Sequence, residues 1–277
     1  MQVENSEGCA GQVPHGDVHR GRAALVTAGG TGIGRAVALD LARCGADVII
    51  AGRRSEPLEK TAAEIEWIGA RALAVPVDIR DDDQVGSMVD QALERFGRID
   101  TLVNNAGGQF SAPAEEITGK SWRAVHRLAV DATWAVTQEV AVRAMIPQRS
   151  GVVFFMAFSP RRGIPSMVHA TSARAALENL ASSLALEWSR YGIRTICIAP
   201  GTIATEGMEG NYSAEERAQW EAAVPLGRLG TAEDVSGVIA FLATPAARHV
   251  TGTTILIDGG ADAWGTGQPV PPMEQQP

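Results

Sequence analysis

The sequence predicts a single-domain α/β fold, a doubly wound parallel sheet of seven strands with helices on both faces. Short apolar runs alternate along the chain with longer segments that carry apolar residues at helical spacing, and this alternation is typical of βαβ units. A glycine-rich turn joins the first apolar run to the first helical segment, at residues 28–34. The 277 residues, 45% of them hydrophobic, suffice for one well-buried domain.

The predicted strands are seven short apolar runs. They lie at residues 23–26, 46–51, 72–77, 99–103, 151–156, 193–198 and 254–257. Runs without polar alternation are typical of parallel strands that helices cover on both faces. Helical spacing of apolar residues occurs at 35–42, 55–68, 81–96, 120–146, 168–190 and 232–243. The buried face of the second helix is expected to hold Leu58, Ala62, Ile65 and either Trp67 or Ile68.

The two ends of the chain and one internal segment lack such patterns. Residues 1–21 are polar without periodicity, and residues 265–277 are rich in Pro, Gln and Gly, so we expect flexible tails around a domain at 22–264. Residues 202–230 have no regular pattern and are rich in Glu and Gly. A segment of this length beside the sheet is expected to be irregular and to form a substrate lid, at about residues 205–228.

Composition argues against several classes of partner. The formal net charge of -8 and the pI of about 5.2 disfavour nucleic acid, since phosphate backbones bind clustered Lys and Arg. Cys9, Cys44 and Cys197 are widely spaced and show no metal-ligand pattern, so we expect reduced thiols, no metal and a cytoplasmic location. No apolar run approaches the roughly 18 residues that span a bilayer, and no membrane contact is expected.

The glycine-rich turn predicts a bound dinucleotide, which makes the predicted domain a Rossmann fold. Glycines between a strand and a helix let backbone N–H groups approach a pyrophosphate, and the helix N-terminus adds partial positive charge. The residues of this turn that we expect to contact the cofactor are Thr27, Gly29, Thr31, Gly32, Ile33 and Gly34.

The residues after the second and third strands bear on which dinucleotide binds. Arg53 and Arg54 follow the second strand, where an acid would bind the ribose 2′-hydroxyl of NAD and an arginine the 2′-phosphate of NADP. The pair favours NADP(H), although the same residues could simply begin a solvated helix. Asp78 and Ile79 follow the third strand. Asp78 is expected either to accept a hydrogen bond from the adenine amino group or to cap the next helix.

Two further turns end the fourth and sixth strands. They are expected to face the same crevice, because ligands of doubly wound sheets bind where the carboxyl ends of the strands converge. The residues expected to line the cofactor site here are Asn105, Ala106 and Gly107 in the first turn and Pro200, Gly201, Ile203 and Thr205 in the second.

These motifs resemble the short-chain dehydrogenase/reductase family over about residues 22–264. The glycine turn, Asn104-Asn105-Ala106-Gly107, Pro200-Gly201 and Asp258-Gly259-Gly260 occur in the family's order. Within the family, the segments around Gln109, Phe110 and His169 are similar to peroxisomal trans-2-enoyl-CoA reductases and their bacterial relatives. The resemblance implies NADPH-dependent reduction of the double bond of an enoyl thioester, a small-molecule substrate, and a homotetramer.

The resemblance breaks down at the family's catalytic set. By position, the family's Asn falls on Ala129, its Ser on Ala157, its Tyr on Ala170 and its Lys on Arg174, and Ala28 replaces the first glycine of the turn. Carbonyl reduction needs a proton donor beside the developing alkoxide, and each lost oxyanion donor costs about 10²- to 10³-fold in rate. We therefore expect no ordinary alcohol dehydrogenase activity.

Three residues are candidates for the missing catalytic groups. Arg174 is expected to bond the nicotinamide ribose and to keep a positive charge at the site, although a guanidinium cannot shuttle a proton as lysine does. Tyr212 is the one phenol placed to serve as an acid, and its alternative role is to anchor the lid. His169 adjoins the position of the missing tyrosine and either donates to an enolate or packs at the helix start.

Three functions remain open from the sequence. Enoyl reduction makes the least demand on the missing residues, because water can protonate the α-carbon after hydride addition. The second is a non-redox enzyme, a cyclase, isomerase or lyase, that keeps the dinucleotide site as a scaffold. The third is a catalytically silent member of the family. The similarity around Gln109 and His169 favours the first, and the loss of all four catalytic side chains favours the other two.

Overall fold

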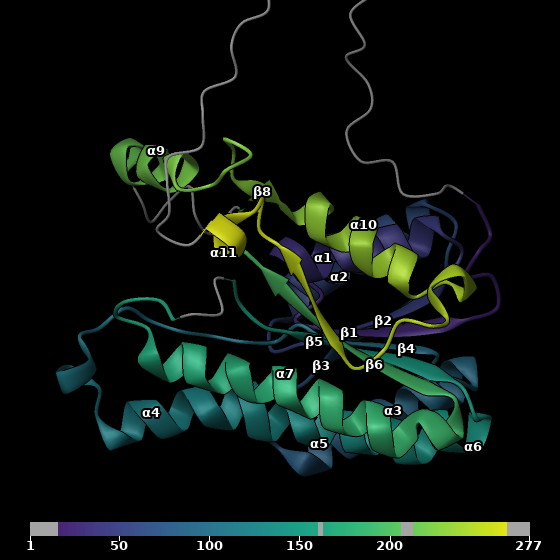
Figure 1. Cartoon of the computed structure of the whole chain (residues 1–277). Coiled ribbons are helices and arrows are strands. Elements are labelled where there is room, and N and C mark those ends of the chain that lie inside the picture. The colour runs from purple at the N-terminus through teal and green to yellow at the C-terminus, as the bar shows by residue number, and fades with distance from the viewer. Residues whose placement is uncertain (1–15, 160–162, 206–212, 265–277) are drawn as a thin grey trace, which may run out of the picture.

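The structure is a computed structural model, and it describes residues 16–159, 163–205 and 213–264. It confirms the predicted fold class, because a parallel seven-stranded sheet lies between two layers of helices (Figure 1). Tyr212, the candidate acid of the lid, lies outside the described residues.

Every predicted strand forms, within about two residues of its expected bounds. The strands are β1 (Ala23–Thr27), β2 (Asp47–Gly52), β3 (Ala72–Pro76), β4 (Thr101–Asn104), β5 (Gly151–Met156), β6 (Ile193–Pro200) and β9 (Thr253–Ile257). Their order in the sheet is β3-β2-β1-β4-β5-β6-β9. The winding direction therefore reverses between β1 and β4, and such a reversal leaves a crevice at the carboxyl ends of the two strands.

Helices cover both faces of the sheet, as Figure 1 shows. One layer holds α1 (Gly32–Arg43), α2 (Ser55–Trp67) and α10 (Ala232–Leu242). The other holds α3 (Asp82–Phe96), α4 (Gly119–His126), α5 (Ala132–Val140), α6 (Ile146–Gln148) and α7 (Val168–Trp188). Short helical turns are η1 (Ala114–Glu116), η4 (Ser189–Tyr191), η5 (Pro245–Ala247) and α11 (Ala261–Trp264). None of the helices in the described part of the chain combines the length and apolarity needed to cross a bilayer.

The helix predicted at 120–146 forms, but with two π-helical segments within it. η2 (Arg127–Asp131) joins α4 to α5, and η3 (Ala141–Met145) joins α5 to α6. The backbone stays helical at each junction, so the five segments form one helix. A π turn takes more residues than an α turn, and the 3.6-residue periodicity of the sequence does not reveal it.

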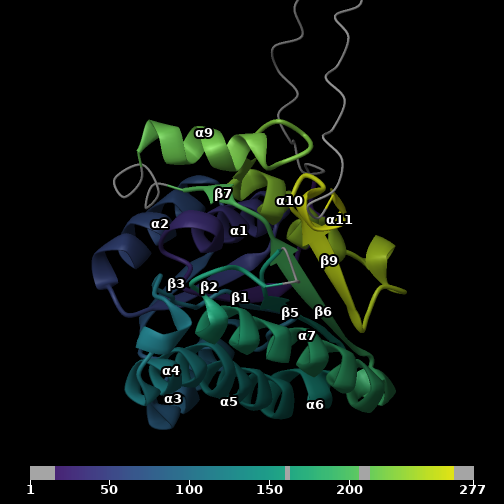
Figure 2. The same cartoon turned by 60° about the vertical axis from the view of Figure 1, so that its left-hand side comes forward.

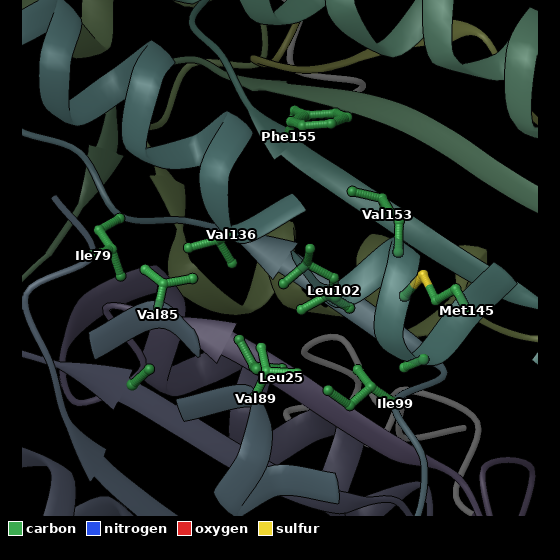
Figure 3. Close-up of a cluster of buried hydrophobic side chains, with 14 of the residues drawn as sticks. Leu25, Ile79, Val85, Val89, Ile99, Leu102, Val136, Met145, Val153 and Phe155 are labelled. Atoms are coloured by element: carbon green, nitrogen blue, oxygen red, sulfur yellow. The ribbon is translucent and has the colours of Figure 1, made fainter. Parts of the chain in front are cut away.

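Each face of the sheet carries its own core, because successive residues of a strand point to opposite faces. Leu25 and Leu102 point to the face covered by α3 and α5, where they pack in one cluster with Val136 (Figure 3). Their neighbours Val26 and Val103 pack on the other face, in the core beneath α1 and α10. Helices thus cover both faces, which explains why the strands appear in the sequence as continuous apolar runs.

One local feature differs from the sequence prediction, and a second decides between two alternatives that the prediction left open. His19, expected in the flexible N-terminal tail, is packed: it is 1% exposed, and its Nε2 lies 3.1 Å from the carbonyl oxygen of Ala240 in α10. The other residues from 16 to 21 are exposed. At the end of α2, Ile68 packs on the core, whereas Trp67 is 89% exposed. Neither feature produces a periodic pattern, because each depends on a single side chain.

The predicted lid contains regular structure, so the expectation of an irregular segment is wrong in this part. Figure 2 shows α9 (Ala214–Ala222) over the layer that holds α1 and α10. β7 (Ile203–Ala204) pairs with β8 (Gly230–Thr231) in a second, two-stranded sheet. α9 consists mainly of polar residues with good helix propensity, and a helix without an apolar stripe is not visible in a search for periodicity.

Candidate cofactor and substrate site

Thr27 and Asn105 hold the ends of β1 and β4 together where the winding reverses. The Thr27 hydroxyl accepts hydrogen bonds from the backbone N–H groups of Asn105 and Ala106, each at 3.0 Å. The Asn105 side chain donates to the carbonyl oxygen of Thr27 at 3.2 Å. Thr27 is 1% exposed, so its side chain acts chiefly by holding the ends of β1 and β4 in place through these hydrogen bonds.

The glycine turn is packed too closely for side chains. A Cβ on Gly34 would lie 2.3 Å from the carbonyl oxygen of Ala28 and 2.5 Å from the side-chain nitrogen of Asn105. Gly32 has a φ of 53°, a conformation that residues with a side chain rarely adopt. Ala28 nevertheless adopts it, with a φ of 52°, at the turn position where the resemblance implies a glycine.

The N-terminus of α1 offers the anion site that the turn predicts. Thr31 precedes the helix and makes no side-chain hydrogen bond to it, and the first turn contains no acid. The first N–H groups of a helix have no partner within the helix, and they bind phosphates. Gly29 closes the back of the turn, where a Cβ would lie 2.7 Å from Ile50 Cγ2. This close-packed turn and open helix terminus fit a dinucleotide pyrophosphate.

A small cavity of about 150 Å³ lies between this turn and the end of β2. Arg53 and Arg54 line it together with Gly30 and Thr31. Both arginines are exposed, and neither forms an ion pair with another described residue. Two guanidinium groups without an ion pair to a described residue, beside a phosphate-binding turn, suit an additional phosphate on the ribose.

Asp78 lies at the end of β3 and is ionised at neutral pH. Arg80 donates to its carboxylate from Nε at 2.8 Å and also from Nη2, and these bonds lower the pKa of Asp78 to about 2. The cap of α3 is Asp81, whose side chain accepts from two N–H groups of the first turn, so Asp78 is not the helix cap. Ile79 is 6% exposed within the core, which leaves mainly its backbone available to a ligand.

A larger cavity of about 620 Å³ opens at the carboxyl ends of β4, β5 and β6. Many of the predicted cofactor residues line it: Ile33, Asn105, Gly107, Arg174, Pro200, Gly201, Ile203 and Thr205. Sequence reasoning missed a second, mostly apolar part of the lining: Met156, Phe158, Ile164, Met167, Thr202 and Trp220. The sequence does contain a signal for this part of the lining, namely the apolar residues at the end of the fifth strand and just after it, in the segment 156–167.

Arg174 is a buried cation at the edge of this cavity. It is 7% exposed, and its Nη1 donates to the carbonyl oxygen of Met156 at 2.7 Å. The guanidinium carbon lies 5.1 Å from the centre of the Phe158 ring. Burial lowers the pKa of Arg174 to about 10, so the side chain stays charged at neutral pH. Among the described residues no carboxylate pairs with it, and a charge buried in this way favours an anionic or strongly polar partner.

The surroundings of Arg174 on α4, η2 and α7 are apolar. Ala129 and Ala170 belong to one buried cluster with Val125, and Phe158 and Met167 pack against it. Ala157, at the end of β5, is also buried. None of the three alanine side chains has a polar atom, so these positions supply no proton donor to the cavity.

His169 is packed rather than exposed to the cavity. It is 0% exposed, and its ring stacks on Phe110 with centroids 4.2 Å apart. Within the described part of the chain, neither ring nitrogen has a hydrogen-bond partner, and burial lowers the pKa of His169. The stacking agrees with the packing alternative for this residue.

Comparisons with known proteins cover the whole of this site. The Enoyl-(Acyl carrier protein) reductase family model matches residues 27–262. A probable 2,4-dienoyl-CoA reductase of Bacillus subtilis is 37% identical over 243 residues, which make up 86% of this chain and 96% of that protein. The gluconate 5-dehydrogenase of Gluconobacter oxydans is 37% identical over 243 residues, or 87% of this chain and 94% of that protein.

The fold comparison extends over the same region. A solved structure of a citronellol catabolism dehydrogenase of Pseudomonas aeruginosa PAO1 matches with a TM-score of 0.81 at 35% identity, and the match covers 91% of this chain and 100% of that one. The family match over residues 27–262 includes the residues of the crevice and of the cavity.

Proposed function

The chain belongs to the short-chain dehydrogenase/reductase family of oxidoreductases, and from that membership we propose that it is an NADPH-dependent reductase of an activated carbon–carbon double bond, in an enoyl thioester or an enone. The description of the matched family and the dienoyl-CoA reductase among the relatives support this choice. A gluconate dehydrogenase is equally similar, so the choice between a double bond and a carbonyl group depends on the site.

The observation that carries the proposal is the buried charge of Arg174 beside an apolar cluster. In this proposal Ala129, Ala157, Ala170 and Arg174 replace the Asn, Ser, Tyr and Lys of the family's catalytic set. An acid that protonates oxygen works best with a pKa near the operating pH, and the pKa of Arg174 is about 10. A fixed cation of this kind suits the stabilisation of an enolate oxygen better than proton transfer.

The crevice suits NADPH as the cofactor. The glycine turn and the open N-terminus of α1 would hold the pyrophosphate. Arg53 and Arg54 would bind the 2′-phosphate, and Asp78 would accept from the adenine amino group. When bound, NADPH supplies a hydride to the β-carbon of the double bond. The predicted residues that line the larger cavity would hold the nicotinamide end.

Arg174 has two tasks in this proposal. Its guanidinium binds the ribose hydroxyls of the cofactor, and its charge stabilises the oxygen of the enolate that forms at the thioester or ketone. The carbonyl oxygen of Met156 fixes the guanidinium, and Phe158 covers one of its faces. Tyr212 is our proposed proton donor from the lid, with water as the alternative source for the α-carbon. We assign His169 to packing.

NADPH consumption with trans-2-enoyl-CoA substrates of several chain lengths and with a cyclic enone tests the proposal. The wild-type protein is expected to consume NADPH and to form products heavier by two hydrogens. Arg174→Ala is expected to lose at least 10²-fold in turnover, because it removes the cation at the enolate oxygen. Gly108→Ala is the matched control, since a Cβ there would meet only Leu128, at 3.5 Å. Tight NADPH binding without consumption on either substrate class would contradict the proposal.

The apolar cluster around Ala129 and Ala170 favours a second candidate, a non-redox enzyme that uses the dinucleotide site as a scaffold. Such an enzyme would be a cyclase, isomerase or lyase. Its reaction would give products with no net gain of hydrogen and would leave NADPH unchanged, so mass spectrometry of the products separates it from the reductase. A protein without any turnover would be the catalytically silent alternative.

We also propose that the protein is a homotetramer. Apolar side chains are exposed on the outer helices: Trp134 on α5 is 38% exposed, Val142 in η3 is 54% exposed, and Leu186 on α7 is 85% exposed. Large exposed apolar groups on neighbouring helices are typical of subunit interfaces. Light scattering is expected to give four times the chain mass of 29.1 kDa, and a monomer would contradict this proposal.

A further inference from the structure

A third cavity, of about 380 Å³, lies at the opposite end of the sheet from the cofactor crevice. Arg22 and Asp100, which line it, directly precede β1 and β4, and Gly151 and Ile193 begin β5 and β6. Further lining comes from the chain around η5 and before β9: Ala243, Thr244, Pro245, Arg248 and Thr251. The cavity therefore collects the amino ends of four strands, far from the glycine turn at their carboxyl ends.

The charge in this cavity is positive, although the whole chain is acidic. Three arginines line it, Arg22, Arg194 and Arg248, and they are accompanied by one acid, Asp100. The Asp100 carboxylate is already engaged, because it accepts from Nε and Nη2 of Arg98 at 2.7 and 2.6 Å and from the N–H of Ala23 at 2.9 Å. In the part of the chain that the structure describes, none of the three lining arginines forms an ion pair.

Arg194 is fixed in this cavity by groups that do not neutralise its charge. Its Nη2 donates to the carbonyl oxygen of Leu242 at 2.7 Å, and its Nη1 donates to that of Val250 at 3.2 Å. Burial and the nearby charge of Arg22 lower the pKa of Arg194. The guanidinium groups of Arg22 and Arg194 thus repel one another at a half-buried site. A multiply charged anion bound between them would offset this electrostatic repulsion.

The other polar groups and the size of the cavity indicate the kind of anion. The lining includes the hydroxyl-bearing residues Ser150, Ser189, Thr244 and Thr251. Guanidinium groups bind phosphate oxygens with paired hydrogen bonds, and hydroxyls add further donors. The volume of about 380 Å³ lies within the usual range for small-molecule pockets. Inorganic phosphate alone would fill only part of this volume.

We propose that this basal arginine cavity, defined by Arg22, Arg194 and Arg248, binds a small organic phosphate. The site is separate from the cofactor crevice, and the proposal does not depend on the reductase activity. Binding of such an anion ties η5 and the start of β9 to the amino ends of the central strands. It therefore stabilises the folded protein.

Titration calorimetry and thermal unfolding with inorganic phosphate and with glycerol 2-phosphate test this proposal, at an ionic strength held constant with sodium chloride. Arg22→Gln with Arg248→Gln is expected to weaken binding of both probes at least tenfold, since each lost charged hydrogen bond contributes about one order of magnitude. Arg248 is exposed, so Arg248→Gln alone serves as a second variant if the double variant fails to fold. Arg95→Gln, a change of an exposed arginine on α3, is the charge-matched control for the single variant Arg248→Gln.

Phosphate can also bind at the cofactor end, so a variant with Arg53→Gln and Arg54→Gln is titrated in parallel. The proposal requires that this variant keep the wild-type affinity for glycerol 2-phosphate while the basal variant loses it. The reverse pattern, or a wild-type response no larger than that to chloride, would overturn it.

Discussion

The guanidinium of Arg174 occupies the space that a side chain on Gly107 would fill. A Cβ on Gly107 would lie 1.8 Å from Nη2 and 2.9 Å from Cζ of Arg174. Gly107 follows β4 and Arg174 belongs to α7, so the two segments meet at the cavity only because position 107 lacks a side chain. The orientation of the Arg174 guanidinium therefore depends on Gly107, which lies in a different segment of the chain.

Gly107→Ala is expected to displace Arg174 and to break its bond to the carbonyl oxygen of Met156. Hydrogen bonds of charged groups contribute about 1.5–3 kcal/mol, so we expect a loss of at least tenfold in NADPH affinity and in kcat/KM. Gly108→Ala, one residue later, should remain close to wild type. The comparison uses cofactor titration and steady-state kinetics, and equal behaviour of the two variants would show that Gly107 has no such role.

Replacing Arg53 and Arg54 with glutamine is expected to reduce the preference for NADPH over NADH. Each arginine should contribute roughly tenfold through charged hydrogen bonds to the 2′-phosphate, and the NADH affinity should stay nearly constant. Fluorescence titration with both cofactors measures the ratio. An unchanged ratio of NADPH to NADH affinity would show that the two arginines do not bind the 2′-phosphate and only begin α2.

Ala28→Gly is expected to raise the free energy of unfolding by up to about 1.6 kcal/mol. A left-handed conformation costs an alanine about 1–2 kcal/mol, and the greater freedom of glycine in the unfolded chain offsets about 0.4–1 kcal/mol of that gain. Urea unfolding with an unchanged m-value checks the effect. Ala24→Gly, at a buried position in β1 with no such conformation, should instead destabilise the protein.

The stability of the protein is expected to fall as the pH is lowered below about 6.5. Burial lowers the pKa values of both His19 and His169, so the unfolded chain takes up protons first. The slope for each histidine cannot exceed about 1.4 kcal/mol per pH unit. His169→Phe, which keeps a ring against Phe110, should reduce the slope between pH 7 and pH 5 in denaturant unfolding. If the slope of this variant matches that of the wild type, His169 takes no part in the pH dependence.

The sheet could be predicted from the sequence because its strands are buried on both faces. Residues 151–156 appear as one apolar run and form β5 with the same bounds. α9 could not be found in this way, because it has few apolar residues and its Trp220 packs against Val224 and Leu229, which lie beyond the helix. The burial of His19 depends on a carbonyl group in α10, 221 residues away.

The candidate site was predictable in its glycine-rich parts and less so in its apolar parts. Glycines near strand ends mark places where backbone and ligand approach closely, and Gly34 and Gly107 meet that expectation in the structure. Phe158 and Met167 line the cavity through the path of the chain after β5, which no spacing rule defines. Nor does the sequence reveal that Arg174 lacks a carboxylate partner within the described ranges, since ion pairs form between distant segments.

The strand order has a consequence for the chain while it is being made. Of the seven strands of this sheet, β1 leaves the ribosome first, yet it lies in the interior of the finished sheet, with β2 on one edge and β4 on the other. When β2 and β3 have formed, the second edge of β1 still presents unpaired N–H and C=O groups beside an apolar run. Open edges of this kind pair readily with other chains. Residues 101–104 close this edge when they emerge, and the open edge then passes to β4 until β5 has formed.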